Sequence, residues 1–265
     1  MNLLKNKYTI YRYLYLIPIF FIYSFIGTYS QKNTEQFRSS KDIGFYHSIF
    51  AGFELTKGNE DFFKLVGSYR IDYYQSKFHT FLVGDLEYKE GNNSVISNKG
   101  FLHYRFIYQG LKHINPETFY QIEYDHFLLM EHRNLFGAGI RIDISNYADS
   151  DSSTKIDFDL GFGIMNEYEK YQINSPGYSD LVRLTNYLSM FVIFNEKSQL
   201  NLVMYFQPAV YELDDYRILA EMKLQFPIFR NFNFFTQLNY RYDNDPLPNL
   251  KYYTLGLNNG FSIQF

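Results

Sequence analysis

Apolar and polar residues alternate along most of the chain, and polar turn residues break the alternation at fairly even intervals. In the last stretch, Tyr253, Leu255 and Leu257 share one parity. Thr254 and Gly256 share the other. A period of two is that of a β-strand, whose successive side chains point to opposite faces. The pattern therefore predicts strands that each have one apolar and one polar face.

Residues 44–265 divide into twelve such stretches, whose spacing suits membrane strands of about 9 to 11 residues. A chain that ends in a strand leaves an unpaired edge unless its first and last strands pair. We therefore predict an all-β fold of one domain: a closed antiparallel up-and-down transmembrane β-barrel of about 12 strands over residues 44–265. The predicted strands are Phe45–Leu55, Phe63–Tyr73, Phe78–Lys89, Lys99–Tyr108, Phe119–Leu128, Arg133–Ile144, Lys155–Met165, Arg183–Phe194, Gln199–Val210, Tyr216–Phe226, Phe232–Asp243 and Tyr252–Phe265.

Alternation alone does not tell whether the apolar face fills a core or contacts lipid. The apolar face is aromatic or branched on nearly every strand, whereas a small closed core needs small residues to fit its taper. About eight strands already give an interior that side chains fill, so twelve enclose more space than an apolar face would fill. We therefore predict that the apolar face points to lipid and the polar face points to the lumen.

The polar face carries charges of both signs, and these interleave along the strands. A selective pore is expected to line up one sign, as rings of like charge do. We interpret the mixture as cross-strand ion pairs that fill and stiffen the lumen, with a substrate-selective constriction as the alternative. A rim ion pair is expected between Asp125 and Arg133. The predicted lumen-lining residues are Arg70, Arg105, Glu123, Asp125, Arg133, Arg141, Asp157, Asp159, Arg183, Glu221 and Arg241.

The N-terminal stretch has the features of an export signal. Its first 30 residues hold three cations and no acid, and residues 14–26 form the apolar run LYLIPIFFIYSFI. This run is shorter than the about 20 residues of a membrane-spanning helix and contains Pro18. We predict a signal peptide at residues 1–30 and a short periplasmic segment at residues 31–43, with an uncleaved inner-membrane anchor as the alternative.

Composition narrows the possible functions. The chain has 25 Lys and Arg against 28 Asp and Glu, for a formal charge of −3. Without the three cations of the signal peptide the mature chain is more acidic, so a nucleic-acid partner is not expected. The absence of cysteine excludes disulfides and thiol chemistry. Aromatic residues make up 21% of the chain, which is typical of interfacial girdles but also follows from codon bias.

Two alternatives to a plain barrel remain open. Some outer-membrane barrels of twelve strands are phospholipases, yet none of the six histidines has the serine spacing such a hydrolase needs, so no catalytic residue, cofactor or metal is predicted. With both chain ends in the periplasm, the longest outer loop is predicted at Asn166–Leu181. This loop is a candidate surface for binding a ligand.

Four stretches give the mature chain a resemblance to the family of salt-induced outer-membrane proteins, a β-barrel family of undefined function. The central stretch matches through Asp125, Arg133, Gly137, Gly139 and Arg141. The resemblance implies an outer-membrane barrel and brings no catalytic residue with it. The four stretches are AGFELTKGNED (Ala51–Asp61), QIEYDHFLLMEHRNLFGAGIR (Gln121–Arg141), GFGIMNEYEKY (Gly161–Tyr171) and RYDNDPLPNLKYYTLGLNNGFSIQF (Arg241–Phe265).

The C-terminal aromatic residue points to an assembly route. Phe265 resembles the signal that the barrel-assembly machinery recognises, which implies insertion by that machinery. Together these features predict a non-enzymatic protein of the bacterial outer membrane that contacts outer-membrane lipids. Its expected role is structural, or that of a narrow passive channel with a charge-balanced lumen.

Overall fold

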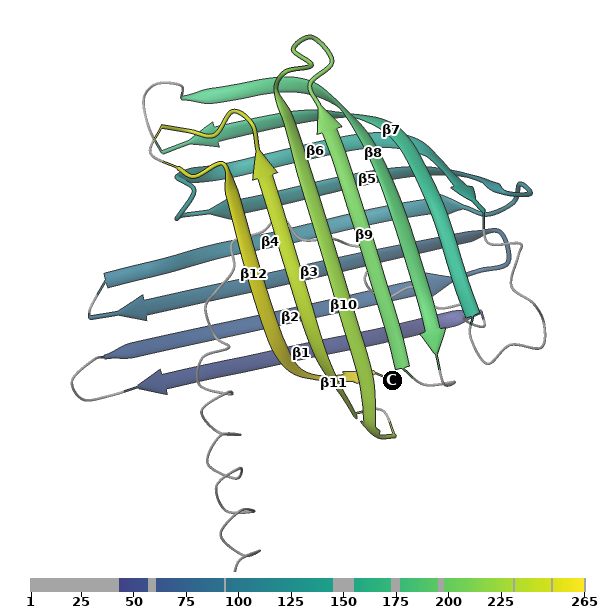
Figure 1. Cartoon of the computed structure of the whole chain (residues 1–265), viewed down its shortest axis with the longest axis horizontal. Helices are drawn as coiled ribbons and strands as arrows, with labels where there is room; N and C mark the ends of the chain where they lie inside the picture. The colour runs from purple at the N-terminus through teal and green to yellow at the C-terminus, as the bar shows by residue number, and fades with distance from the viewer. Residues whose placement is uncertain are drawn as a thin grey trace, which may run out of the picture.

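The computed structural model describes residues 43–56, 61–92, 94–144, 155–172, 177–194, 198–230, 232–248 and 250–264. Twelve antiparallel strands follow one another around a single barrel, each paired with its neighbours in sequence (Figure 1). The predicted fold class and strand number are thus confirmed. The strands are β1 (Gly44–Thr56), β2 (Phe62–Tyr74), β3 (Phe78–Gly91), β4 (Ser94–Tyr108), β5 (Ile114–Asp125), β6 (Met130–Asp143), β7 (Lys155–Tyr171), β8 (Tyr178–Phe194), β9 (Ser198–Pro208), β10 (Tyr216–Phe229), β11 (Phe232–Asp243) and β12 (Tyr253–Gln264).

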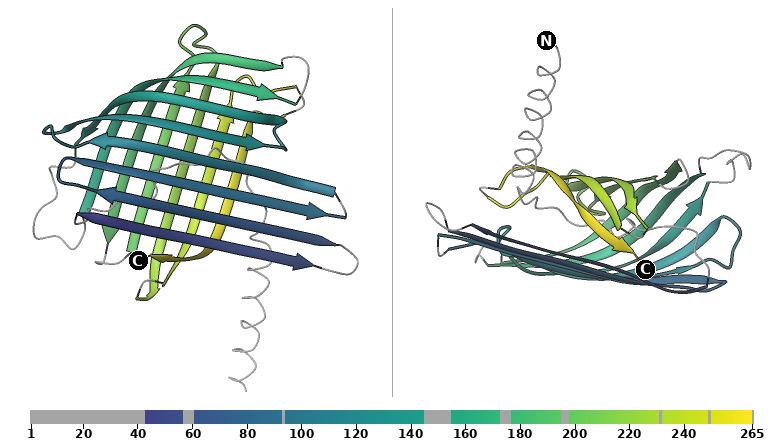
Figure 2. Two further views of the ribbon diagram at one scale, coloured as in Figure 1. Left: turned by 180° about the vertical axis from the view of Figure 1, so that it is seen from behind. Right: turned by 90° about the horizontal axis from the view of Figure 1, so that it is seen from below.

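The barrel is flattened in cross-section. Seen from below, β1 to β3 form a nearly flat layer, and the strands close to the C-terminus lie on the opposite side (Figure 2, right). In the other views, β1 to β4 cross β9 to β12 at a large angle (Figures 1 and 2). The part of the chain that the structure describes contains no helix long and apolar enough to cross a membrane.

The alternation of the sequence becomes an alternation of exposure. On β7, Phe162 is 47% exposed, whereas Asp159 is 1% exposed. On β5, Tyr120 is 46% exposed and Gln121 only 3%. The apolar face is therefore the outer face of the barrel, and most polar side chains of the strands point inward.

The interior also holds apolar side chains, which the sequence reasoning did not predict. They pack on the inward face as three separate groups between the charged residues, and no single core forms from them. Inward positions are therefore a mixture of ionic and apolar contacts, both of which fill space. The three groups are Phe81, Val83 and Ile107; Phe119, Leu135 and Met165; and Tyr187, Val203, Tyr205 and Leu219.

The first and last strands meet at one end of the barrel only. Their register has two pairs, Ser48 with Gln264 and Ile49 with Ile263. By contrast, β7 and β8 share sixteen pairs. The barrel is thus nearly closed, with a seam between β1 and β12 that opens toward the C-terminal end of β1.

A side-chain contact spans the seam just where the backbone pairing stops. The ring centroid of Phe50 on β1 lies 6.2 Å from that of Phe235 on β11, so the two rings meet across β12. Gly260 on β12 allows this approach, since a Cβ there would lie 3.0 Å from Phe235 and 3.7 Å from Phe50. The aromatic pair therefore holds together two strands that are not adjacent in the sheet.

The open seam is testable because the chain has no native cysteine. We expect the double variant Ser48→Cys/Gln264→Cys to form a disulfide in the folded barrel, since these residues face each other in the register. Glu54 and Asn258 would face each other if the same register continued into the open part of the seam, and we expect no cross-link in the variant Glu54→Cys/Asn258→Cys. Gel mobility after mild oxidation shows whether each variant has formed a disulfide. Equal cross-linking of the two variants would show that β1 and β12 are paired along their whole length.

The predicted outer loop at Asn166–Leu181 is wrong. β7 continues to Tyr171 and β8 begins at Tyr178, so only residues 172–177 lie between them. The alternation of inward acidic and outward residues continues through this stretch, where polar composition had indicated a loop. The ligand-binding role predicted for that loop stays a prediction, now for this shorter connection. The predicted signal peptide, residues 31–42 of the predicted periplasmic segment, and Phe265 lie outside the described residues.

Candidate functional site: the charged lumen

A network of arginines and carboxylates occupies the lumen near the end where β5 turns into β6. Arg133 on β6 lies between Glu123 on β5 and Glu167 on β7. Its Nη1 donates to Glu123 Oε1 at 2.8 Å, its Nε donates to Glu167 Oε2 at 3.1 Å, and its Nη2 also donates to Glu167. The side chains of Arg133 and Glu167 are both 0% exposed. These two charges are thus fully removed from solvent.

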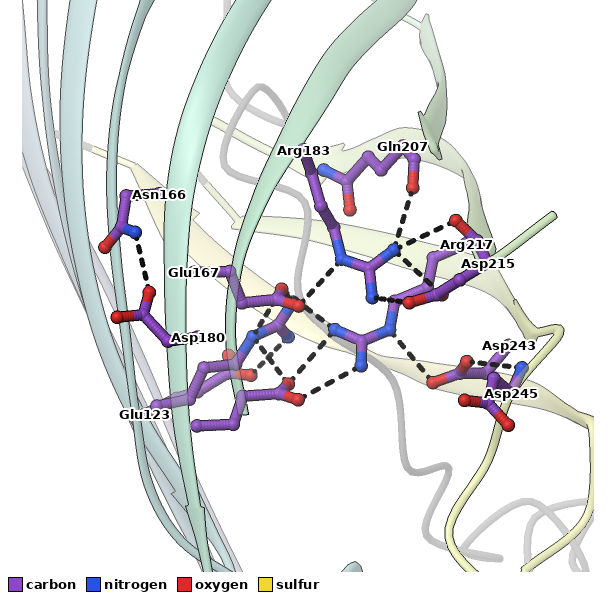
Figure 3. A network of polar contacts seen from close by, with 12 residues as sticks. Glu123, Asn166, Glu167, Asp180, Arg183, Gln207, Asp215, Arg217, Asp243 and Asp245 are labelled. Carbon is purple, nitrogen blue, oxygen red and sulfur yellow. Dashed lines mark hydrogen bonds and ion pairs between the residues drawn. The ribbon is translucent and has the colours of Figure 1, made fainter. Parts of the chain in front are cut away.

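Glu167 also binds two further guanidinium groups (Figure 3). Arg183 Nε donates to its Oε1 and Arg217 Nη1 to its Oε2, both at 2.8 Å. Arg183 holds Asp215 through two N–H groups, at 2.9 and 2.8 Å, and Arg217 Nε donates to Asp243 at 2.9 Å. We name the residues linked in this way the first cluster: Glu123, Arg133, Glu167, Glu169, Arg183, Asp215, Arg217, Arg241 and Asp243.

The first cluster is nearly neutral, with four arginines against five carboxylates. An isolated buried ion costs several kcal/mol, and only close opposite charges with well-formed hydrogen bonds offset this. Arg183 binds Asp215 through a bidentate ion pair, which is stronger than an ion pair with a single hydrogen bond. Removing one member therefore leaves others buried without their partners.

A second cluster lies farther from the β5–β6 turn and is centred on Glu117 of β5. Arg141 Nη2 donates to Glu117 Oε2 at 3.1 Å, and Arg105 Nη1 lies 3.5 Å from the same oxygen. Tyr187 Oη donates to Glu117 Oε1 at 2.9 Å and accepts from Arg141 Nε at 2.8 Å. Arg105, Glu117, Arg141 and Tyr187 thus form a hydrogen-bonded group that spans the lumen from β4 to β8.

A third charged group lies at the other end of the barrel from the first cluster, where β2 leads into β3. Arg70 donates to Asp72 through Nε and Nη2, both at 2.7 Å, and His79 Nε2 lies 2.8 Å from the same carboxylate. The guanidinium of Arg70 covers the ring of Phe81 at 3.9 Å from its centroid. Tyr74 stacks on His79 with ring centroids 4.0 Å apart. The charged members of this group, Arg70, Asp72 and His79, thus come from the adjacent strands β2 and β3.

Three hollows follow one another along the lumen. One of about 60 Å³ lies at the loop end, beside Lys251 and Tyr252. It shares Leu128, Met130 and Arg241 with a second hollow of about 80 Å³. A third, of only about 30 Å³, lies deeper in the barrel, between the first and second clusters. The lumen therefore holds space on both sides of the first cluster.

The structure brings most of the predicted lumen residues into these clusters. Glu123, Arg133, Arg183 and Arg241 belong to the first, Arg105 and Arg141 to the second, and Arg70 to the third. Within the described ranges, no three histidine or acidic side chains converge to hold a metal ion. The remaining predicted residues also point inward. Asp157 is half-buried, and Asp125, Asp159 and Glu221 are buried.

The expected ion pair between Asp125 and Arg133 is replaced by other contacts. Asp125 Oδ1 accepts from the backbone N–H groups of Phe127 and Leu128, at 3.0 and 3.2 Å, and so stabilises the turn after β5. Arg133 instead binds Glu123 of β5, and Glu167 and Glu169 of β7. The reason is register, since Glu123 lies directly opposite Arg133 and the pairing shifts between Glu123 and Asp125.

Several central residues were missed by the sequence reasoning. Glu117 and Tyr187 have the inward parity of their strands, but the predicted fifth strand began too late to include Glu117. Glu167 and Glu169 continue the parity of Asp159 and were assigned to a loop. Asp215 lies in the turn before β10, where no alternation marks it. Extending the fifth and seventh strands until the parity failed would have found Glu117, Glu167 and Glu169.

The fold and this lumen define a twelve-stranded β-barrel with an apolar outer face and an ionic interior. A family model described as "Protein of unknown function, DUF481" matches residues 49–265, and the chain belongs to this family. The description of this family does not mention salt, so that part of the name of the resembling family is not confirmed. No curated protein matches the chain.

Two solved porins resemble the chain. A KdgM porin in complex with disordered oligogalacturonate has 14% identity and a TM-score of 0.39, over 83% of this chain and 98% of the porin. A NanC porin has 9% identity and a TM-score of 0.46, over 83% of this chain and 99% of the porin.

Proposed function

We propose that the protein is an outer-membrane β-barrel that acts as a narrow passive channel for small hydrophilic solutes. The observation that carries this proposal is the series of hollows along a lumen whose charges are nearly balanced. The first cluster is the constriction between them, and its neutralised charges favour neither cations nor anions strongly.

The outer surface supports a position in the membrane. Stacked or edge-on aromatic rings link Phe45, Tyr73, Phe78 and Phe106 around the end of the barrel where β2 meets β3, with centroids 4.3 to 5.9 Å apart. Aromatic rings at the two boundaries of an apolar band are typical of barrels in lipid, where they lie at the level of the headgroups.

The opposite end of the barrel carries a matching set of rings. Tyr216 lies between Phe206 and Tyr242, with centroids 5.7 and 5.8 Å away. Tyr168 and Tyr178 stack at the same end with centroids 6.4 Å apart. The apolar outer face is thus bounded by aromatic side chains on both sides, as a lipid-embedded barrel requires.

Conductance of the refolded protein in planar bilayers tests the proposal. We expect small single-channel currents and a reversal potential close to zero in a salt gradient, because the constriction is narrow and nearly neutral. Buffer with detergent but no protein gives the background of the bilayer. Folded protein that inserts without raising the current above that background would contradict a channel and leave a structural role.

A further inference from the structure

A hollow of about 720 Å³ lies on the outer face of the barrel, across β2 to β6. It is several times larger than the three hollows of the lumen, and its volume falls in the range of small-molecule sites. We name this hollow the outer groove. Its walls are exposed side chains with the outward parity of their strands: Tyr69, Leu86, Leu102, Ile122 and Tyr124.

Glycines form the floor of the outer groove. Gly67 on β2 and Gly84 on β3 are outward positions, and Gly84 lies directly opposite Tyr69 in the register. A Cβ at Gly67 would have no neighbour nearer than 4.0 Å, and one at Gly84 would make an ordinary contact of 3.4 Å with Leu102. Packing inside the protein therefore does not require glycine at either position. Glycine inside a strand often marks a close approach by another molecule.

Most of the outer groove is apolar, although two carboxylates of the lumen also border it. Asp85 and Glu123 line it, but both are buried and have the inward parity of their strands. Glu123 is engaged by Arg133 in the first cluster. The exposed charge of the groove is therefore confined to one end, where it reaches β6.

That end of the groove is formed by Glu131 and His132. The ring centroid of His132 lies 5.7 Å from that of Tyr168, which belongs to the aromatic set at this end of the barrel. Lys170 Nζ binds Glu131 at 2.9 Å, and both side chains are nearly half exposed. The groove thus reaches the level of lipid headgroups, where it meets a positive and a negative group side by side.

The surroundings and the charges of the groove together indicate its occupant. The hydrocarbon core of a bilayer holds no water, so an acyl chain fills an apolar hollow on the outer face of a membrane barrel. A headgroup that carries both charges matches Lys170 and Glu131. A purely anionic headgroup would be repelled by Glu131 and by the exposed Asp180 of β8.

We propose that the outer groove binds one zwitterionic phospholipid, such as phosphatidylethanolamine, with an acyl chain over Gly67 and Gly84. The phosphate of its headgroup contacts Lys170, and its ammonium group contacts Glu131. The proposal rests on the membrane position argued above, but it does not depend on conduction.

Quenching of a single tryptophan by brominated lipid tests the proposal on the refolded full chain in micelles. The chain has no native tryptophan, so Tyr69→Trp places the only one in the groove. Phosphatidylethanolamine brominated in the middle of its acyl chains should quench this residue saturably, at a single lipid for each barrel. Phe206→Trp is the control, since Phe206 is an exposed residue of β9 that does not line the groove, and its quenching should not saturate. Identical curves for the two reporters would show only nonspecific contact with lipid and overturn the proposal, even if the protein conducts ions.

Brominated phosphatidylglycerol, whose headgroup is anionic, tests the charge assignment. With the Tyr69→Trp reporter it should bind about tenfold more weakly than phosphatidylethanolamine, because Glu131 repels it. Glu131→Gln should remove this difference, since it leaves Lys170 as the nearest charge. Equal affinities of the two lipids before this substitution, or a difference that survives it, would overturn the proposal.

Filling the groove separates the site from the rest of the outer face. In the reporter background, Gly84→Leu should weaken binding of phosphatidylethanolamine at least about tenfold, because its side chain displaces methylene groups of the acyl chain. Ala138→Leu is the matched control, since it adds similar bulk at an exposed position of β6 that does not line the groove, and it should leave the affinity unchanged. Equal affinities of these two variants would overturn the proposal.

A second variant covers the case in which Gly84→Leu does not fold. Gly67→Leu fills the floor from β2, where a Cβ meets nothing nearer than 4.0 Å, and it should weaken binding in the same way. Folding of each variant is checked by its gel mobility before and after heating. A folded Gly67→Leu protein that binds the lipid like the wild type would overturn the proposal. So would a dimer that dissociates on Gly84→Leu in size-exclusion chromatography, because it would assign the groove to a second copy of the chain.

Discussion

Glu167→Ala is expected to lower the free energy of unfolding by about 3–5 kcal/mol, the cost of breaking a buried ion pair from one side. Glu167 is fully buried and binds Arg133, Arg183 and Arg217, so its removal takes one ion-pair partner from each of these three buried guanidinium groups. Urea unfolding of the refolded protein in micelles, with the linear extrapolation, measures the change. The same variant removes the one excess negative charge of the first cluster, so any preference of the proposed channel for cations should decrease, visible as a shift of the reversal potential in a salt gradient.

Glu131→Ala is the matched control for this prediction. Glu131 binds Lys170 at 2.9 Å near the same end of the barrel, but these side chains are 48% and 44% exposed. Exposed ion pairs contribute little, because water and salt screen them. A destabilisation by Glu167→Ala no larger than that by Glu131→Ala would mean that the first cluster does not hold the barrel together.

The barrel could be predicted from the sequence because strand alternation is a local property. Each strand repeats the pattern of apolar and polar residues, so a misplaced boundary does not change the number of strands. Predicted boundaries of β4, β5, β7 and β8 were wrong by several residues, and the end of β7 lies where the inward face carries a dense run of charges. Glu167 and Glu169 belong to such a run, and polar composition there resembles that of a loop although the side chains are buried.

The partners of each charge could not be predicted, because they depend on register and on strands far apart in sequence. Arg133 and Glu167 are separated by 34 residues, and Arg217 and Glu167 by 50. A shift of one strand by one residue would exchange the inward and outward faces. The seam between β1 and β12 was equally hidden, since the alternation of both strands continues past the point where their pairing stops.

The position of the ionic clusters along the lumen links the fold to the proposed function. The strands that carry the clusters are fixed in register by long runs of backbone pairs. Ion pairs between these strands stiffen the wall of the lumen, and hollows remain on both sides of the first cluster. The interior is therefore interrupted by a constriction and is not a uniform pore.

Gly161→Val is expected to destabilise the barrel by about 3 kcal/mol, through overpacking and the loss of buried hydrogen bonds. The ring of Tyr187 lies directly over Gly161, and a Cβ at this position would overlap it. Tyr187 would have to move away, which breaks its hydrogen bonds with Glu117 and Arg141. The free energy of unfolding in urea measures the loss, and a conductance trace should show larger currents because the second cluster loosens.

Gly67→Val is the matched control, because it places a valine in a strand without the overlap with Tyr187. Gly67 lies on the outer face of β2, and a Cβ there would find its nearest neighbour at 4.0 Å, the backbone oxygen of Phe50. Valine suits a lipid-facing strand position, so the change in stability should stay within about 0.5 kcal/mol. Equal stabilities of the two variants would show that Tyr187 does not need the space above Gly161, and that the second cluster is not built around its hydroxyl group.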